Sequence, residues 1–597
     1  MMRLHQHRLR SLALLAVFLL AFALRLYGLG AGSLWYDETV SVFLAAKGLP
    51  ELVAHTAGDI HPPGYYALLH LWTRLAGSGD FAVAFPSVFF GLLLVALADR
   101  LGRRIFGPTA GLLAATLVAL SPYNLWYSQE VRMYTLGAAL GMGLLLTVLS
   151  LLDAPTGRSR RAARLALYAV LAALGLWTLY YFAFLLVALN LMAALWWLIA
   201  WRSGRSSWRW LGDWLLAQVG ALLLYAPWLP VAWRQATDPP VPPWREAVSA
   251  GALVVESWSA LSLGQSVDPA RVWPALLLFV LLLVLGLAAR VRPRFRVWGP
   301  ALLAGHVFLP VLLIYLASTL TPLYHVRYVF TYSTPFYVLI AAGIAWLGRR
   351  WRPLAWLSLG LVVGLSAGSI YAYHTDPRYA SDDHRAAVRF LAESWRPGDA
   401  ILVNAGYAYT ALVTYWDGDP IAWRGRLAGD GMPGFVTQAG AGPIVVQTGT
   451  VDGDSTLGWG DPESDFYAMP AGEAAGALEE LFSTFHRVWV YRIYDTVTDP
   501  QGFLRGWLAE HGTQFEDQVY SGEGQLRVQG FLTQRDPLAG VDTTHDGAVG
   551  DGALVLAGSA LPTAKVEVGG ALDLALVWEV TGAPPADAVL FAGLFDD

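Results

Sequence analysis

The sequence predicts a polytopic α-helical membrane domain, followed by an exoplasmic α/β domain and a partial β-rich module. Three observations support this fold class. Hydrophobic residues make up 56% of the chain and charged residues 14%, whereas a soluble domain carries about 25% charged residues. Apolar runs long enough to cross a bilayer recur up to residue 372 and then stop. Residues 1–372 carry a net charge of +15, and residues 373–597 carry −20.

The composition also excludes several classes of protein. The chain has no Cys, which excludes Cys-ligated zinc, iron–sulfur clusters and thiol catalysis. The acidic tail argues against nucleic acid as a partner, because phosphates require a basic surface. The high hydrophobic content excludes a disordered chain and an ordinary cytosolic enzyme. The lipid bilayer is therefore the partner that the composition itself predicts.

The membrane domain is predicted to contain about eleven transmembrane helices. A bilayer core of about 30 Å is spanned by about 20 apolar residues in a helix. The third and fifth runs are short, and the fifth and sixth can be mistaken for one long helix. The runs cover residues 11–29, 81–98, 108–122, 133–152, 165–179, 181–201, 214–233, 272–289, 298–317, 329–347 and 354–372.

Arginine predicts the orientation of these helices. The N-terminus and every second connecting segment together hold 20 Arg and three acidic residues. The remaining connecting segments hold ten acidic and seven basic residues. By the positive-inside rule, the N-terminus is cytoplasmic and residues 373–597 are exoplasmic. The first run is interpreted as an uncleaved anchor in the plasma (inner) membrane. A cleaved signal peptide is the alternative, and it leaves the later topology unchanged.

Polar residues collect in four clusters on the predicted exoplasmic side. The first connecting segment contains residues 35–38 (Trp-Tyr-Asp-Glu) and 59–66 (Asp-Ile-His-Pro-Pro-Gly-Tyr-Tyr). The second contains residues 128–134 (Ser-Gln-Glu-Val-Arg-Met-Tyr), and the fifth contains residues 324–328 (Tyr-His-Val-Arg-Tyr). A carboxylate base and cations for a leaving phosphate are what group transfer at a membrane face requires. The candidate site residues are Asp37, Glu38, His61, Glu130, Arg132, Tyr134 and Arg327.

Each cluster also has a structural interpretation. Asp37 can cap a helix that begins near Thr39, because its carboxylate would accept bonds from the free amides of the first turn. His61 precedes two prolines that fix a rigid turn. The two charged residues of the third cluster are two positions apart, so they need not pair on a helix. Arg327 can extend to lipid headgroups. The position of all four clusters at one membrane face favours the functional interpretation.

Three of these blocks resemble bacterial glycosyltransferase family 39. They are residues 34–38 (Leu-Trp-Tyr-Asp-Glu), 61–66 (His-Pro-Pro-Gly-Tyr-Tyr) and 127–134 (Tyr-Ser-Gln-Glu-Val-Arg-Met-Tyr). Residues 85–87 (Phe-Pro-Ser) and 103–107 (Arg-Arg-Ile-Phe-Gly), which lie between them, resemble the family as well. The family includes the dolichyl-phosphate-mannose protein mannosyltransferases and the aminoarabinose transferases of lipid A, and its members have the GT-C fold. The resemblance is strong over about the first 150 residues and weakens toward residue 530.

The resemblance implies an inverting transfer from a polyprenyl-phosphate sugar at the outer membrane face. Asp37 corresponds to the acid of the family's first loop and would take the proton from an acceptor hydroxyl. That hydroxyl attacks the anomeric carbon, and polyprenyl phosphate leaves. Glu38 is the second candidate catalytic residue, and Arg327 is the candidate for the leaving phosphate because guanidinium suits phosphate oxygens. The residues expected to bind substrate or shape the site are His61, Glu130, Arg132, Tyr134 and Arg327.

The acceptor, the sugar and a metal are left open. The protein mannosyltransferases carry a basic residue shortly after His-Pro-Pro, whereas residues 64–69 (Gly-Tyr-Tyr-Ala-Leu-Leu) offer none. This departure puts a protein acceptor in doubt, and the acceptor class stays glycan, lipid or protein. Neither a hexosyl nor a pentosyl donor is favoured. No cofactor is certain, and the carboxylates and His61 can ligate a divalent metal although their spacing forms no metal motif.

The tail is predicted to form three further parts. Residues 373–535 alternate helices with strands and predict a small α/β domain. Residues 536–552 are predicted to be a linker, and residues 553–597 resemble the opening of a β-sandwich, most clearly at 571–579. The α/β domain is expected to contain helices at 382–395, 407–416, 471–484 and 501–511 and strands at 400–403, 443–447, 487–493, 515–520 and 526–532.

Two other functions compete with a GT-C glycosyltransferase in residues 1–372. A transporter or flippase for lipid-linked sugars is expected to show internal repeats and broken helices at the midplane. The sequence shows no repeat, and its acids lie in the outer segments. A non-catalytic surface protein that binds through its tail would not need the adjacent acids Asp37 and Glu38. The sequence therefore favours the glycosyltransferase.

Overall fold

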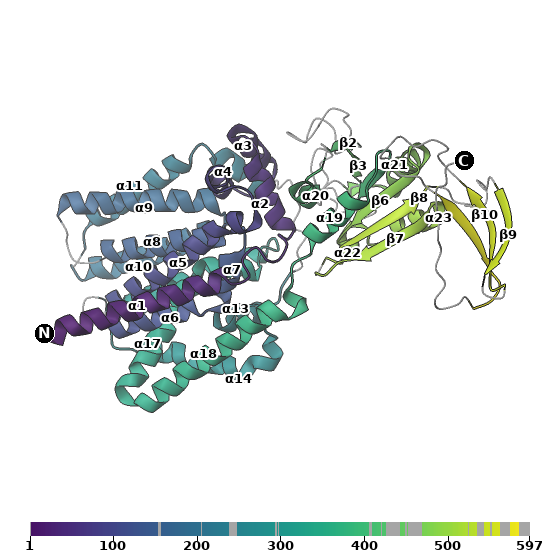
Figure 1. Ribbon diagram of the computed structural model, residues 1–597. Coiled ribbons are helices and arrows are strands. Elements are labelled where there is room, and N and C mark those ends of the chain that lie inside the picture. Colours follow the sequence, from purple (N-terminus) through teal and green to yellow (C-terminus); the bar gives the residue numbers. More distant parts are fainter. Residues whose placement is uncertain are drawn as a thin grey trace. The chain divides into compact units, whose positions relative to one another are not determined.

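The computed structural model divides into two compact units. One comprises Met1–His384 with Ser521–Glu523, and the other comprises Arg385–Tyr520 with Gly524–Asp597. The first unit is built of helices, and the second contains the described strands (Figure 1). The structure describes residues 2–152, 157–204, 206–237, 247–292, 295, 298–404, 409–418, 421–424, 442–447, 450–451, 468–522, 524–533, 543–549, 552–560 and 574–583.

The first unit is a bundle of apolar helices. Within the described residues, eight helices are long and apolar enough to cross a membrane, and the number rises to ten if each of two bent pairs is one span. The chain is thus a multi-pass membrane protein. The eight helices are α1 (Met2–Leu26), α5 (Asp80–Ile105), α8 (Tyr134–Leu151), α9 (Arg158–Thr178), α10 (Phe182–Arg202), α14 (Pro269–Leu287), α15 (Gly299–Ser318) and α18 (Arg352–Thr375).

Two bent pairs complete the long helices. The helix α11 (Trp208–Tyr225) turns by 86° into α12 (Leu229–Thr237). The short helix α16 (Val326–Val329) and the 3₁₀ turn that follows it bend by 63° into α17 (Thr334–Arg350). All eleven predicted runs therefore lie on helices. The eleven-span topology stays a prediction, because the third run forms α6 (Pro108–Ala119), which has only 12 residues.

The helix α6 packs very closely against α5. A Cβ atom at Gly111 would lie 2.7 Å from the backbone oxygen of Asp99, and one at Gly102 would lie 3.0 Å from that of Ala110. Small residues let helix backbones approach closely in membranes. These two glycines therefore allow the 12-residue α6 to pack tightly against α5 inside the bundle.

Short helices connect the long ones at the end of the bundle opposite the N-terminus (Figure 1). Two of them follow residue 35 in succession: the first ends at Ala46, and Gly48 and Pro50 begin the next. The short helices are α2 (Tyr36–Ala46), α3 (Leu49–Gly58), α4 (Gly64–Ala76), α7 (Pro122–Gln129) and α13 (Ala250–Leu263).

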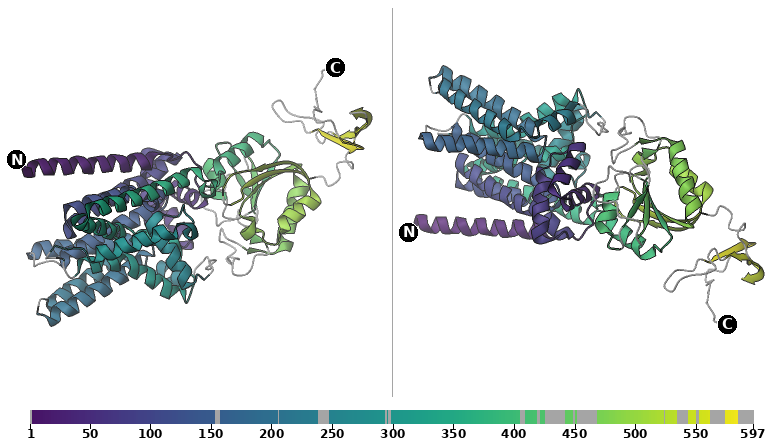
Figure 2. Two further views of the ribbon diagram at one scale, coloured as in Figure 1. Left: turned by 90° about the horizontal axis from the view of Figure 1, so that it is seen from below. Right: turned by 90° about the horizontal axis from the view of Figure 1, so that it is seen from above.

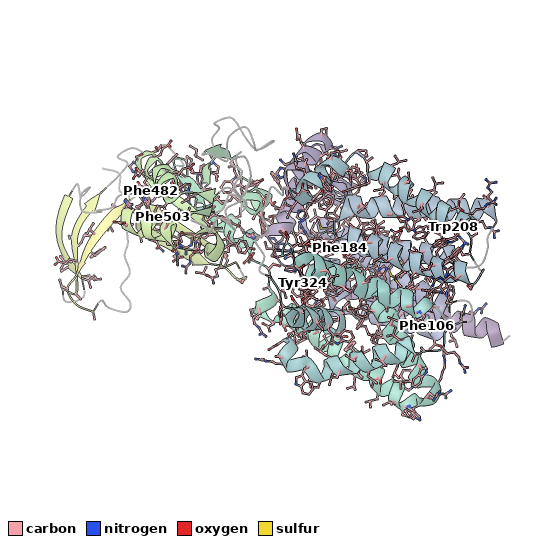
Figure 3. The ribbon with its side chains drawn as sticks, turned by 180° about the vertical axis from the view of Figure 1, so that it is seen from behind. Phe106, Phe184, Trp208, Tyr324, Phe482 and Phe503 are labelled. Carbon is pink, nitrogen blue, oxygen red and sulfur yellow. The ribbon has the colours of Figure 1, made fainter. Side chains whose placement is uncertain are left out.

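The other end of the bundle carries the arginine-rich segments. Arg10 donates to Asp99, and Arg161 lies 2.9 Å from Asp213. Arg104 donates to the Ser150 hydroxyl at 2.7 Å. In Figure 3, Phe106 and Trp208 mark this end, and Tyr324 lies toward the opposite one. The separation of charges that the sequence predicts between the two sides is therefore present in the bundle.

The second unit contains a six-stranded mixed sheet with the order β2-β3-β1-β6-β8-β7. The first four strands are parallel to one another, and β8 pairs antiparallel with both β6 and β7. Helices lie on both faces of the sheet (Figure 2). The strands are β1 (Ala400–Val403), β2 (Ala422–Arg424), β3 (Ile444–Gln447), β6 (Arg487–Arg492), β7 (Thr513–Val519) and β8 (Arg527–Leu532).

Alternating side chains of the strands meet different helices. Leu402 and Val490 pack on one face, in a core that Leu478 and Leu508 share. On the other face, the Trp489 ring meets Phe390 at 6.0 Å. The helices are α19 (His384–Ser394), α20 (Tyr409–Tyr415), α21 (Ala471–Thr484), α22 (Asp495–Thr498) and α23 (Phe503–His511).

The predicted helices and strands of the α/β region are confirmed, and several short elements were not predicted. They are β2, α22, β4 (Thr450–Val451) and β5 (Ala468–Met469), whose two to four residues are too few to show a period. The strand β9 (Thr543–Val549) lies inside the predicted linker and pairs with β10 (Leu554–Ala560). β11 (Ala575–Val580) confirms only the last part of the predicted 571–579 strand. The remainder of the linker and most of the last module lie outside the described residues.

Candidate active site

Three of the polar clusters meet around one carboxylate. Asp37 lies in the first turn of α2, and its Oδ2 accepts a hydrogen bond from Arg327 Nη1 at 2.9 Å. Arg132 Nη2 lies 3.8 Å from the same oxygen. Residues that are 95 and 290 positions away along the chain thus place two guanidinium groups beside Asp37. The Arg327 side chain thus points to Asp37 and does not take the alternative position, in which it would extend to lipid headgroups.

The helix-capping interpretation of Asp37 is wrong. The helix α2 begins at Tyr36 rather than near Thr39, and Trp35 is the residue that precedes it. The backbone amide of Trp35 donates to Glu38 Oε2 at 3.1 Å. Glu38, at the third helical position, therefore satisfies the amide of the residue that precedes the helix, and Asp37 does not cap it. The Asp37 carboxylate is left to face the two arginines.

Glu38 joins α2 to the segment that carries Arg132. Its Oε1 accepts a hydrogen bond from the backbone amide of Val131 at 2.6 Å, and its side chain is buried. Burial, together with the nearby Glu130 carboxylate, raises the pKa of Glu38 to about 8. The neutral form of Glu38 is thus favoured at pH 7.

Arg132 is the most buried of the charged groups in the site, with 2% of its side chain exposed. Its Nη1 donates to the backbone oxygen of Asp37 at 2.9 Å and to the Ser41 hydroxyl at 3.4 Å. Its Nη2 lies 3.3 Å from His61 Nε2. The other ring nitrogen of His61, Nδ1, lies 3.0 Å from Asp59 Oδ2.

The charges around Asp37 keep it ionised. Burial alone would raise the pKa of Asp37, but the charges of Arg132 and Arg327 hold it below its usual value. Glu130 is different, because burial raises its pKa to about 7 despite Arg327. Glu130 Oε1 accepts a hydrogen bond from Trp126 Nε1 at 2.6 Å. Of the three candidate carboxylates Asp37, Glu38 and Glu130, only Asp37 has a lowered pKa.

Aromatic rings surround this charged cluster. The Arg327 guanidinium lies over the Trp35 ring, 5.4 Å from its centroid. The buried Tyr134 ring packs against Tyr127 at 5.0 Å and Tyr328 at 6.4 Å. An apolar wall of this kind strengthens electrostatic interactions by excluding water. The candidate Tyr134 also interacts through its side chain with Arg132 and therefore belongs to the cluster.

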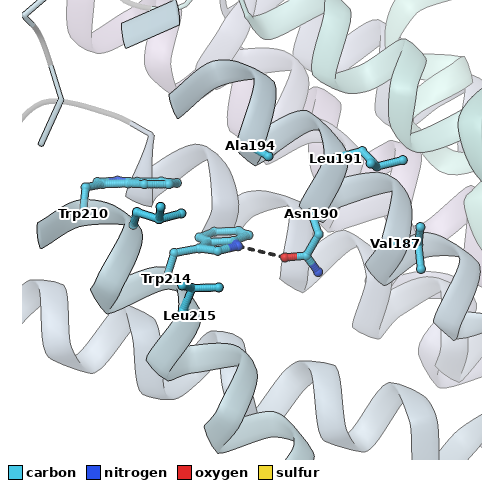
Figure 4. Close-up of a pocket in the computed structure, with 8 residues that line it drawn as sticks. Val187, Asn190, Leu191, Ala194, Trp210, Trp214 and Leu215 are labelled. Atoms are coloured by element: carbon cyan, nitrogen blue, oxygen red, sulfur yellow. Dashed lines mark hydrogen bonds between the residues drawn. The ribbon is translucent and has the colours of Figure 1, made fainter. Parts of the chain in front are cut away.

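The described residues contain no group of three or more His, Asp or Glu that could hold a metal ion. A cavity of about 370 Å³ lies elsewhere, between α10 and α11 (Figure 4). It is lined by apolar side chains with Trp210, Trp214 and Asn190, and Trp214 Nε1 donates to Asn190 Oδ1 at 2.8 Å. None of its lining residues is titratable, so it offers no acid–base chemistry.

Sequence reasoning missed three residues that support the site. Asp59 lies two positions before His61 in the same sequence block, and this proximity could have indicated that the two side chains interact. Ser41 contacts Arg132 but has no sequence signal beyond its position one helical turn after Asp37. Gln235, from α12, contacts the end of α3 and has no signal in the sequence.

Comparisons with known proteins agree with this fold. Residues 60–231 match the family model described as "Dolichyl-phosphate-mannose-protein mannosyltransferase". The crystal structure of ArnT from Cupriavidus metallidurans in the apo state is similar, with a TM-score of 0.55 and 12% identity over 87% of this chain and 98% of that chain. ArnT bound to undecaprenyl phosphate gives a TM-score of 0.54 and 13% identity over 87% and 97%. A search of curated proteins finds no match. The chain has the GT-C fold and is similar to glycosyltransferase family 39.

Proposed function

We propose that this GT-C protein is an inverting glycosyltransferase that moves a sugar from a polyprenyl-phosphate donor to an acceptor hydroxyl at the outer membrane face. The observation that carries the proposal is the ionised Asp37 carboxylate, which lies beside Arg132 and Arg327. One site then offers a proton acceptor and two cations. The donor class is supported by the dolichyl-phosphate named in the matched family and by the undecaprenyl phosphate bound to ArnT.

A lipid carrier also explains why the site lies on a membrane bundle. Each buried methylene contributes about 0.8 kcal/mol, so a long prenyl chain stays in the bilayer. The phosphate and the sugar then reach only the membrane surface. The helix α2, which carries Asp37, and the connection between α3 and α4, which carries His61, lie at one end of the bundle, where such a headgroup would arrive (Figure 1).

In the proposed step, Asp37 takes the proton of the acceptor hydroxyl as the oxygen attacks the anomeric carbon. The bond from that carbon to the phosphate oxygen breaks, and polyprenyl phosphate leaves with the electron pair. A single displacement inverts the anomeric centre. Arg327 and Arg132 stabilise the charge that develops on the leaving phosphate, as preorganised cations do in transfer reactions.

The same arginines make Asp37 a weak base while the donor is absent. Their charges hold the pKa of Asp37 below its usual value, and a bound phosphate would attract part of that charge. Donor binding is therefore expected to strengthen Asp37 as a base and to precede acceptor binding. Glu38 and Glu130 hold the site in shape through Val131, Trp35 and Trp126.

Incubating the purified protein with a panel of radiolabelled polyprenyl-phosphate sugars tests this function. We expect one label to move to an acceptor in wild type and in Asp80→Asn, which changes an acid at the start of α5 outside the site. Label crossing a vesicle bilayer without chemical change would support the transporter instead. A panel in which no label is transferred would reject the enzyme.

A further inference from the structure

We infer that Asp59 and His61 are positioning residues that hold the Arg132 guanidinium, an inference that rests on the proposed function. Every guanidinium nitrogen of arginine is a donor, so the contact of Arg132 Nη2 with His61 Nε2 at 3.3 Å requires a lone pair on Nε2. The proton of the neutral ring then lies on Nδ1, which donates to Asp59 Oδ2 at 3.0 Å. Asp59 thus fixes the tautomer that Arg132 requires.

This contact decides where Arg132 points. Its Nη1 is held by the Asp37 backbone oxygen and by Ser41, both on α2. Its Nη2 lies between His61 Nε2 and the Asp37 carboxylate. The His61 lone pair therefore fixes the second nitrogen, which is the one nearest the proposed base. Loss of that contact would leave Nη2 with only the longer contact to Asp37, at 3.8 Å, while the bonds of Nη1 stay in place.

Asp59 is in turn held by a clamp from α12. Gln235 is buried, and its Nε2 donates to the backbone oxygens of Thr56 at 2.9 Å and Ala57 at 3.2 Å. It also donates to the backbone oxygen of Asp59 itself. Carbonyls at the end of a helix lack partners within the helix, so Gln235 stabilises the end of α3.

The clamp is itself anchored in the bundle. The Tyr180 hydroxyl donates to Gln235 Oε1 and accepts from Trp228 Nε1, the latter at 2.7 Å. Trp228 lies where α11 bends into α12. The bend thus places Gln235 against the end of α3. Gln235 supports Asp59, Asp59 orients His61, and His61 in turn holds Arg132.

Protonation of His61 would reverse this arrangement. A hydrogen on Nε2 would face the Arg132 guanidinium, so two donors and two positive charges would meet. The groups that face the ring are Asp59, Arg132, the Asp37 carboxylate and the edge of Tyr66, whose ring centroid lies 6.4 Å away. The Arg132 contact is therefore compatible only with the neutral ring of His61.

The test compares His61→Ala with His61→Gln in the full-length protein. The glutamine oxygen can take the place of Nε2 and accept from Arg132, whereas alanine cannot. We expect His61→Ala to lower kcat by about 10- to 100-fold through misplacement of Arg132, with a smaller change in donor KM, and His61→Gln to recover most of the loss.

Asp59 and a buried control histidine sharpen this test. Asp59→Asn should lower kcat at least as much as Asp59→Ala, because an amide can donate to Nδ1 and favour the wrong tautomer. The matched control is His70→Ala on α4, since His70 is buried and contacts the backbone oxygen of Ala45 at 2.8 Å, outside the site. His70→Ala is expected to lower thermal stability and to leave kcat near the wild-type value.

A double-mutant cycle separates this inference from the proposed function. In an Arg132→Ala background, His61→Ala should cause no further loss of kcat, and its effect on the affinity for undecaprenyl phosphate should vanish as well. Equal losses with and without Arg132 would overturn the positioning role. If wild type transfers no sugar, the proposed function fails, and the binding arm of the cycle still decides whether His61 acts through Arg132.

Discussion

At the scale of single residues, the two adjacent acids of α2 lie in opposite environments. Asp37 faces two guanidinium groups, which hold its pKa below the usual value, and Glu38 is buried with a pKa raised to about 8. Active sites assign roles to neighbouring titratable groups by separating their pKa values in this way. Asp37 is then the proton acceptor of the proposed reaction, and Glu38 holds the segment that carries Arg132.

The raised pKa of Glu38 predicts that the stability of the protein depends on pH. An unfolded glutamate titrates near 4.5, so its neutral folded form adds stability that is fully present below that value and is lost as the pH rises toward 8. Glu130, whose pKa is raised to about 7, acts in the same direction. Thermal unfolding of wild type should therefore occur at a lower temperature at pH 8 than at pH 5.

The variant Glu38→Gln should reduce this difference, because the amide does not titrate. It should also be less stable than wild type at pH 5, since an amide cannot accept from both Trp35 and Val131. An unfolding temperature of Glu38→Gln that falls as steeply with pH as that of wild type would show that Glu38 does not carry the effect.

The position of Arg327 beside Asp37 predicts that its substitution lowers kcat/KM for the donor. A hydrogen bond to a charged group contributes about 1.5–3 kcal/mol, so Arg327→Ala should lower kcat/KM for the donor by the corresponding factor of about 10 to 150. Arg327→Lys should remain poorer than wild type, because a point charge replaces a planar fork. Steady-state kinetics with varied donor check this, and Arg271→Ala, an exposed arginine of α14, is the control. Wild-type kinetics in Arg327→Ala would remove it from the site.

The residues of the site could be predicted from the sequence, but their partners could not. The blocks around Asp37, Arg132 and Arg327 contain the types that phosphate and proton transfer require. The pairing of Arg327 with Asp37 spans 290 positions and depends on how the helices pack. The contact of Gln235 with α3 likewise depends on the bend between α11 and α12, which no local pattern shows.

At the scale of elements, the length of the apolar runs predicted the long helices correctly but did not reveal where two of the runs are bent. The runs at 214–233 and 329–347 each read as one span, whereas the structure has bends of 86° and 63° there. One bend leads to the Gln235 clamp, and the other follows α16, the short helix that bears Arg327. A hydropathy pattern records burial in lipid and not the direction of the helix, so these bends could not be read from it.

The α5–α6 contact predicts a difference between two glycines. Gly111→Leu should strongly lower the yield of folded protein, because its side chain would meet the backbone of α5. Gly360→Ala on α18 is the control, since a Cβ there meets nothing within 4 Å, and it should be neutral or stabilising by about 0.5–1 kcal/mol. Gel-filtration yield and the unfolding temperature measure both. A folded Gly111→Leu protein at wild-type yield would contradict the packing.

At the scale of the whole molecule, charge divides the chain into two parts that the structure also separates. The basic part is the helical bundle, and the acidic part contains the sheet. Composition could predict this division because a bilayer and water impose different residue types. It could not predict the exact end of the first unit at His384, since residues 373–384 are polar and still pack with the bundle.

The charge asymmetry predicts the orientation of the protein in the membrane. Reporter fusions at Ser203, in an arginine-rich segment, and at Gly398, in the acidic part, should lie on opposite sides, with Ser203 cytoplasmic. Alkaline phosphatase and green fluorescent protein fusions at both positions measure this. If both positions report the same side, the exoplasmic placement of the site is wrong.

The most direct measurement for the central claim is the turnover of Asp37→Asn. Asparagine keeps the size of the side chain and can still accept a hydrogen bond from Arg327, but it cannot take a proton at neutral pH. General-base assistance contributes about 10²- to 10⁴-fold, so sugar transfer should fall by that factor while folding and undecaprenyl phosphate binding are retained. A well-folded Asp37→Asn protein that transfers sugar at the wild-type rate would contradict the mechanism.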